Sequence, residues 1–91
     1  MDDFEWDETK RLSNFRKHAL DFRAAVQLFD GRSVVEMRSP YVEEERFRTT
    51  GKLDDRLITV IWTRRGTRIR IISVRRARDG ERREYRALYP D

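Results

Sequence analysis

TRIRIISVRRA, residues Thr67–Ala77, joins an apolar strand pattern to a cluster of arginines. Side chains alternate between the two faces of an extended strand, so Ile69 and Ile71 fall on one face while Arg68 and Arg70 fall on the other. The same alternation places the apolar side chains of residues 72 and 74 on the arginine side. The pattern predicts a central strand that is covered on both faces toward its end.

Two further arginines, Arg75 and Arg76, follow at the predicted exit of this strand. A loop or a helix start at that point would aim them at a ligand, and guanidinium groups match phosphate oxygens better than an ammonium group does. A solvated basic edge without a ligand explains the arginines alone equally well. A phosphate-binding role therefore needs support from the rest of the chain.

The chain has 91 residues, which is enough for one domain spanning residues 1–91 with a modest core. Its composition of 42% charged and 37% hydrophobic residues, together with its periodic segments, predicts a folded domain with a highly charged surface. No apolar run approaches the roughly 20 residues of a membrane helix, and the acidic start is unlike a signal peptide, so we expect a cytoplasmic protein without a membrane partner.

Cysteine is absent and histidine occurs once, which excludes disulfides, thiol catalysis and an imidazole cluster for zinc. We therefore expect neither a metal site nor a cofactor. The charges are distributed unevenly: the first nine residues hold five acids and no base, whereas residues 64–86 hold ten arginines and three acids. This polarity predicts an anionic partner.

Helical periodicity predicts two N-terminal helices. Leu12 and Phe15 lie three residues apart in Glu8–His18, as in the apolar stripe of an amphipathic helix. A second short helix is expected over Phe22–Phe29, with Asp21 as its N-cap. The polar side of the first helix is predicted to carry Lys10, Asn14, Lys17 and His18.

Alternating patterns and turn residues predict the strands. The expected elements are a short strand at Phe4–Trp6, strands at Ser33–Arg38, Glu45–Leu53, Leu57–Thr63 and Thr67–Val74, turns at 41–44, Asp54–Asp55 and Arg65–Gly66, and a helix at Gly80–Leu88 capped by Asp79. The fold class is therefore α+β: a small antiparallel meander packed against two N-terminal helices, with a C-terminal helix. If the apolar sets face the helices, the opposite face is a shallow basic surface formed by Arg46, Arg48, Thr59, Thr63, Arg68 and Arg70.

Five segments, in this order and spacing, resemble BrnT toxins of bacterial type II toxin-antitoxin systems. They are EWDETKRLSNFRKH (Glu5–His18), DFRAAVQLFD (Asp21–Asp30), ERFRTTG (Glu45–Gly51), TRRGTRIRIISVRRA (Thr63–Ala77) and ERREY (Glu81–Tyr85). The resemblance implies a RelE-like fold and a ribonuclease that inhibits translation and growth. It also implies a hetero-oligomer with a BrnA-type antitoxin, through whose ribbon-helix-helix part the complex binds operator DNA.

The chain departs from the family pattern at two helix ends. Family members commonly have glycine where this chain has Ala19, which removes a helix C-cap glycine. They have threonine or serine where it has Arg78, and Asp79 is expected to take over the capping role.

Metal-free RNA cleavage needs a base for the 2′-OH, positive charge for the phosphorane and an acid for the leaving oxygen. For charge stabilisation we expect Arg70, Arg75 and Arg76. Histidine is the only side-chain type here that ordinarily titrates near neutral pH, which makes His18 the first candidate for base or acid, with Glu45 and Tyr85 as alternatives.

The backbone phosphates of the RNA are expected to contact Lys10, Lys17, Arg46, Arg48 and Arg68. Such contacts fix the position of the RNA without reading the RNA sequence. Trp6 and Trp62 lie in apolar alternation and are predicted to pack in the core. Two alternatives remain: a non-catalytic module that binds nucleic acid or the antitoxin in operon autoregulation, and a toxin that has lost its activity.

Overall fold

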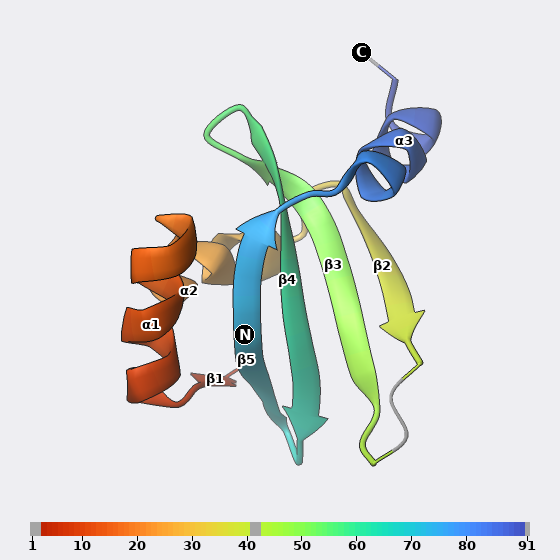
Figure 1. Ribbon diagram of the computed structural model, residues 1–91. Helices are drawn as coiled ribbons and strands as arrows, with labels where there is room; N and C mark the ends of the chain where they lie inside the picture. Colours follow the sequence, from red (N-terminus) through yellow and green to blue (C-terminus); the bar gives the residue numbers. More distant parts are fainter. Residues whose placement is uncertain (1–2, 41–42, 91) are drawn as a thin grey trace.

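A computed structural model describes residues 3–40 and 43–90, so the turn expected at 41–44 lies partly outside the described residues. The chain forms a five-stranded sheet with the order β1-β5-β4-β3-β2 and helices on both sides (Figure 1). This confirms the α+β class. The elements are β1 (Asp3–Glu5), α1 (Glu8–His18), α2 (Phe22–Ala25), the 3-10 helix η1 (Val26–Phe29), β2 (Val34–Ser39), β3 (Arg46–Leu53), β4 (Arg56–Arg65), β5 (Arg68–Arg76) and α3 (Asp79–Leu88).

The strands β3 to β5 form the predicted antiparallel meander. Strand β2 extends it by antiparallel pairing with β3, and β1 adds to β5 as a parallel edge strand. The β3–β4 hairpin turns at Asp54 and Asp55, which have φ angles of 49° and 65°. Two successive positive φ angles match the right-handed twist of the strands and favour this tight turn. Gly66, with φ 61°, closes the β4–β5 hairpin. The predicted turn at Asp54–Asp55 is thus confirmed, whereas the second turn lies at Gly66–Thr67, one residue later than predicted, because Arg65 still pairs with Arg68.

The core lies between one face of the sheet and the segment α2–η1. Phe22 and Leu28 from this segment pack with Ile58, Val60 and Trp62 of β4, and all five are nearly inaccessible to solvent. The indole N–H of the tryptophan donates to a threonine hydroxyl of β3 at 2.8 Å, so its one polar group is satisfied inside the core. The predicted core positions of Trp62 and, at the partly buried margin, Trp6 are confirmed.

An irregularity in the β4–β5 pairing changes which β5 side chains share a face. Val60 pairs with Val74, but Trp62 pairs with Ile71, so β5 holds one extra residue between these pairs. A bulge of this kind reverses the alternation beyond it. Val74 is therefore in the core and is completely buried, and its predicted place on the arginine side is wrong.

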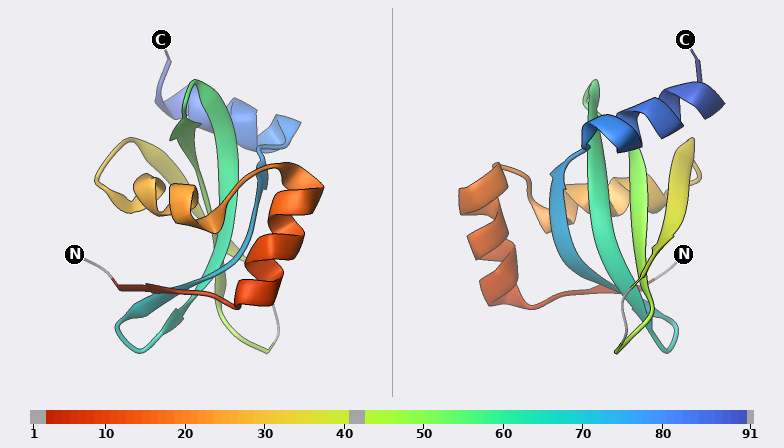
Figure 2. Two further views of the ribbon diagram at one scale, coloured as in Figure 1. Left: turned by 90° about the vertical axis from the view of Figure 1, so that its left-hand side faces the viewer. Right: turned by 45° about the vertical axis from the view of Figure 1, so that its right-hand side comes forward.

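Helix α1 lies beside β5 (Figure 2). One of its side chains pairs with the backbone of β5 as a neighbouring strand would. The amide group of Asn14 donates to the carbonyl of Val74 at 2.9 Å and accepts from its N–H at 3.2 Å. Asn14 is buried and does not belong to the exposed polar side on which we expected it. The expected apolar stripe points outward instead: Leu12 is 45% and Phe15 50% exposed.

The structure describes both helix ends at which the chain departs from the family pattern, the C-terminal end of α1 and the N-terminal end of α3. Ala19 ends α1 in the left-handed region with φ 57°, a conformation that glycine adopts without strain. Helix α3 begins at Asp79 rather than Gly80, with Arg78 as the N-cap residue, and the Glu81 carboxylate accepts the Arg78 N–H at 2.8 Å. The predicted N-cap role of Asp79 is wrong because the helix starts one residue earlier than expected, which makes Asp79 its first residue; the Asp79 carboxylate pairs with Arg82 instead. None of the helices in the described residues is long and apolar enough to span a membrane.

Candidate nucleic-acid interface

The sheet face opposite α2–η1 is basic, as the alternation predicted. Directly paired residues of antiparallel strands share a face, and Arg46, Thr63 and Arg70 form one such row. Arg48 lies in the next row, and Arg75 pairs with Thr59 in the row after it. We call this surface the open sheet face; its charged members include Glu5, Arg46, Arg48, Arg68, Arg70 and Arg75.

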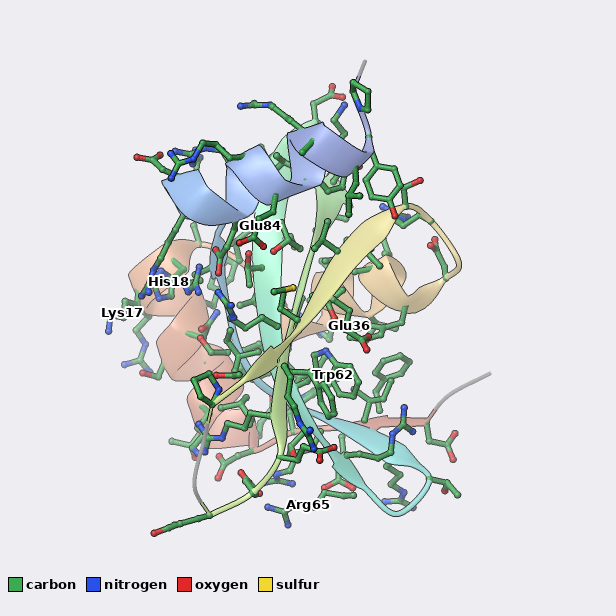
Figure 3. The ribbon with its side chains drawn as sticks, turned by 90° about the vertical axis from the view of Figure 1, so that its right-hand side faces the viewer. Lys17, His18, Glu36, Trp62, Arg65 and Glu84 are labelled. Atoms are coloured by element: carbon green, nitrogen blue, oxygen red, sulfur yellow. The ribbon has the colours of Figure 1, made fainter. Side chains whose placement is uncertain are left out.

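Helix α3 covers one end of the open sheet face, and α1 borders it along β5. Figure 3 shows Lys17 and His18 on the same side of the sheet as α3, whereas Trp62 lies toward α2. The C-terminal end of α1 therefore brings Lys17 and His18 to the side of the sheet on which the open sheet face lies.

A buried carboxylate, Glu81, organises the end of the face under α3. It is 5% exposed and accepts five hydrogen bonds. Arg75 donates through both terminal nitrogens, at 2.7 and 3.0 Å, and Arg48 donates at 2.9 Å. The hydroxyl of Thr59 and the backbone N–H of Arg78 complete the set at 3.0 and 2.8 Å. These residues form the Glu81 cluster.

The environment of Glu81 keeps it ionised. Burial raises the pKa of its carboxyl group, but hydrogen bonds from the Arg75 side chain and the Arg78 N–H outweigh burial and bring the pKa to about 2. The carboxylate thus holds both guanidinium groups in fixed positions at neutral pH. Each guanidinium has five N–H donors, so the ion pairs leave further donors for a ligand.

A second carboxylate, Glu5 on β1, pairs with the arginines at the other end of β5. Arg70 donates to it at 2.7 Å, and Arg68 lies at 3.7 Å. The Arg70 hydrogen bond lowers the pKa of Glu5. The side chain of Arg70 is 29% exposed, so it remains accessible from the open sheet face.

His18 lines a cavity of about 180 Å³ between α1 and β5. Lys10 and Lys17 line the same cavity, and Ser73 contributes from β5. The Ser73 hydroxyl donates to the Asn14 amide oxygen at 3.2 Å, which connects the wall of the cavity to the α1–β5 junction. The structure therefore brings the sole histidine and both predicted lysines together, and we call this the His18 cavity.

The remaining predicted residues lie elsewhere. Arg76 pairs with Ile58, so the strand register places it on the core face of the sheet, opposite to Arg75. Both arginines lie within β5 rather than in a loop beyond it. The Glu45 carboxylate pairs with Arg38.

Tyr85 does not line the His18 cavity. Its side chain lies with Lys52 and Leu57 at the β3–β4 hairpin, and the His18 cavity shares no lining residue with this site. Arg46 donates to Glu44 at 3.3 Å.

The sequence analysis did not identify Glu81, Asn14 or Ser73 as residues that build the site. One local signal existed for the glutamate, because position N3 of a helix commonly carries an acid that accepts the N-cap N–H. Nothing local marks the other two, since their partners are about sixty positions away in the chain.

Taken together, the arrangement suits binding of a polyanion beside a group that can transfer protons. Arginines held by carboxylates present fixed donors, and the His18 cavity is lined by one imidazole and two ammonium groups. In residues 3–40 and 43–90, no group of three histidine, aspartate or glutamate side chains is placed to hold a metal ion.

Comparisons with known proteins connect this arrangement to a family. No curated protein matches the chain. A family model described as "Ribonuclease toxin, BrnT, of type II toxin-antitoxin system" matches residues 6–81. This range includes the His18 cavity, the arginines of β5 and Glu81, and it covers most of the 91 residues. The chain therefore belongs to the BrnT family of ribonuclease toxins of type II toxin-antitoxin systems.

Proposed function

We propose that this toxin cleaves RNA on the open sheet face without a metal ion, as an endoribonuclease whose reaction starts with attack of the 2′-OH on the adjacent phosphate. The product would carry a 2′,3′-cyclic phosphate. One observation carries the proposal: His18 shares a cavity with Lys10 and Lys17 at the border of the sheet face that presents Arg70 and Arg75. A proton-transfer group thus lies beside fixed positive charge.

In this proposal His18 takes or gives the proton, and Arg70 and Arg75 stabilise the charge that develops on the phosphorane. Arg76 was an equal candidate from sequence, but its place on the other face makes it the natural comparison for Arg75. Contacts to neighbouring phosphates are assigned to Lys10, Lys17, Arg46, Arg48 and Arg68. Glu45 and Tyr85 remain alternative proton-transfer groups. Neither of them lines the His18 cavity.

The decisive experiment is single-turnover cleavage of RNA by the purified chain, with and without a chelator. We expect the chelator to have no effect and His18→Gln to lower the rate, since glutamine forms hydrogen bonds but does not titrate. Arg56→Gln, at the exposed start of β4, is the control: it shows the effect of replacing a basic side chain outside the candidate site by glutamine. Cleavage by His18→Gln at the wild-type rate between about pH 5 and pH 9 would remove histidine from the mechanism.

One group of variants should weaken RNA binding, and a second group should lower the rate of turnover. Lys17→Ala is expected to weaken RNA binding and flatten its salt dependence while saturated turnover stays within a few-fold, because a phosphate contact acts equally on ground and transition states. A guanidinium aimed at the phosphorane is worth on the order of 3 kcal/mol, about a hundredfold in rate. Arg70→Ala should show this loss of rate. Arg76→Ala should lose less rate, because the strand register places Arg76 on the other face of the sheet.

The partner of a type II toxin is its antitoxin. We propose a BrnA-type antitoxin that lies over the β5 arginines and inhibits by occlusion, in a complex that reaches operator DNA only through the antitoxin. A RelE-like fold, a cytoplasmic location and inhibition of translation are part of the same proposal and rest on the family resemblance. If the toxin-antitoxin complex cleaves RNA as fast as the free toxin, occlusion is wrong.

A further inference from the structure

A second basic cavity, of about 240 Å³, lies between α3 and the β3–β4 hairpin. We call it the hairpin cavity. Its lining residues are Lys52, Asp55, Leu57, Arg82, Tyr85, Arg86 and Tyr89. Three of these are cations and one is an acid; because Arg82 is paired with Asp79, the positive balance comes from Lys52 and Arg86 against Asp55. It is smaller than the roughly 300–1,000 Å³ of drug-sized ligand sites, which suits a phosphate group with part of its sugar.

The tyrosine in this cavity offers an unused hydrogen-bond donor. Tyr85 is 9% exposed, and its ring packs against that of Tyr89 with centroids 5.1 Å apart. Within the described residues its hydroxyl has no hydrogen-bond partner, and it is not among buried polar atoms that lack one. The hydroxyl therefore reaches solvent at the cavity wall, held in place by a buried ring.

Two of the three cations around this hydroxyl are also available. In the described part of the chain, neither Lys52 nor Arg86 forms a salt bridge. Arg82 donates to the Ala77 carbonyl at 2.7 Å, which fixes its position, and pairs with Asp79. A hydroxyl donor among three cations is a set that recognises a phosphate oxygen.

The hairpin cavity and the Glu81 cluster lie on opposite flanks of α3. Successive residues of a helix are 100° apart, so Arg82, Arg86 and Tyr89 fall on one side of Tyr85 whereas Glu81 falls on the other. The side chains confirm this, because Glu81 contacts Arg48 and Arg75 of the open sheet face. A single RNA chain that reached both sites would pass across α3.

We propose that the hairpin cavity binds a backbone phosphate of the RNA away from the cleaved bond, with Tyr85 and the cations Lys52 and Arg86 as its donors. The inference rests on the proposed ribonuclease function and assigns Tyr85 to positioning of substrate rather than to proton transfer. Tyr89 is 36% exposed, and its hydroxyl donates to the Val34 carbonyl at 2.9 Å, so its fixed ring offers a surface for the adjoining sugar or base.

The test compares binding of a short and a long RNA of mixed sequence, both 2′-O-methylated so that they resist cleavage. A length of about three nucleotides fills one site only, and about twenty span both. We expect Lys52→Gln with Arg86→Gln to weaken binding of the long RNA about tenfold and to reduce its salt slope by about two, with the short RNA unaffected. Tyr85→Phe should give a smaller loss, and Arg83→Gln on the exposed side of α3 is the matched control.

Wild-type affinity of the double variant for the long RNA would overturn the inference. So would perturbation of Lys52 and Tyr85 amide resonances by inorganic phosphate but not by the long RNA, because the cavity would then serve a free anion. Thermal melts of each variant show whether it is folded, and the lysine and arginine changes are on the surface. If the wild type binds long RNA through this cavity yet cleaves none, the nuclease proposal fails and the phosphate site stands.

Discussion

Replacement of Glu81 by glutamine tests whether one buried carboxylate holds the end of the open sheet face together. The pKa of Glu81 lies at about 2 instead of 4.5. At about 1.4 kcal/mol for each pKa unit, this difference corresponds to about 3 kcal/mol of stability from the ionised form. Glutamine keeps the shape but not the charge, and it turns an N–H₂ group toward donors. We therefore expect Glu81→Gln to lower the free energy of unfolding at pH 7 by about 3 kcal/mol.

The sign of the pH dependence follows from the direction of the pKa change. A carboxyl whose folded pKa is lowered stabilises the protein fully above its unfolded pKa and loses that contribution as pH falls through the folded value. Urea unfolding of both proteins between about pH 7 and pH 2 should show the difference converge toward zero in the acid range. Glu84→Gln, an exposed acid on the same helix, is the control. Equal stabilities at pH 7, or a difference that does not change with pH, would refute the reasoning.

Three other outcomes are expected. Ala19→Gly should raise the free energy of unfolding by about 1 kcal/mol, seen in a thermal melt, because the left-handed conformation costs alanine more than the added chain entropy costs glycine; a lower melting temperature would contradict this. Asn14→Leu should cost about 2–4 kcal/mol, since it leaves the backbone groups of Val74 unpaired, whereas exposed Ser13→Ala should cost little. His18→Gln should remove one limb of the pH profile of cleavage while RNA affinity stays within a few-fold.

The sheet was predictable because the residues that determine its strand pairing lie close together in the sequence. Hairpin turns at Asp54–Asp55 and Gly66, and apolar alternation in β4, determine pairing between neighbours in the chain, and the structure agrees with each. The bulge in β5 was not predictable from the same pattern. The segment IISV (residues 71–74) is compatible with regular alternation. The bulge forms because both Ile71 and Val74 pack in the core, which needs one extra residue between them.

That bulge also decided which arginine joins the candidate site. With regular alternation Arg76 would share a face with Arg70, and Arg75 would face the core. With the extra residue the assignment is reversed, and Arg75 meets Glu81. Similarly, helical periodicity placed Asn14 on a polar surface, because a sequence pattern does not show that a strand edge lies beside the helix.

The two carboxylates of the open sheet face determine how the pH dependence of cleavage should be interpreted. Glu5 and Glu81 are internal counter-ions, and their arginine partners lower the pKa of each below its ordinary value. Both pairs therefore stay charged in mildly acidic solution, and Arg70 and Arg75 keep their positions when pH falls from 7 to about 5. A change of cleavage rate in that range therefore cannot come from release of these arginines, and under the mechanism that we propose it would reflect a proton-transfer step.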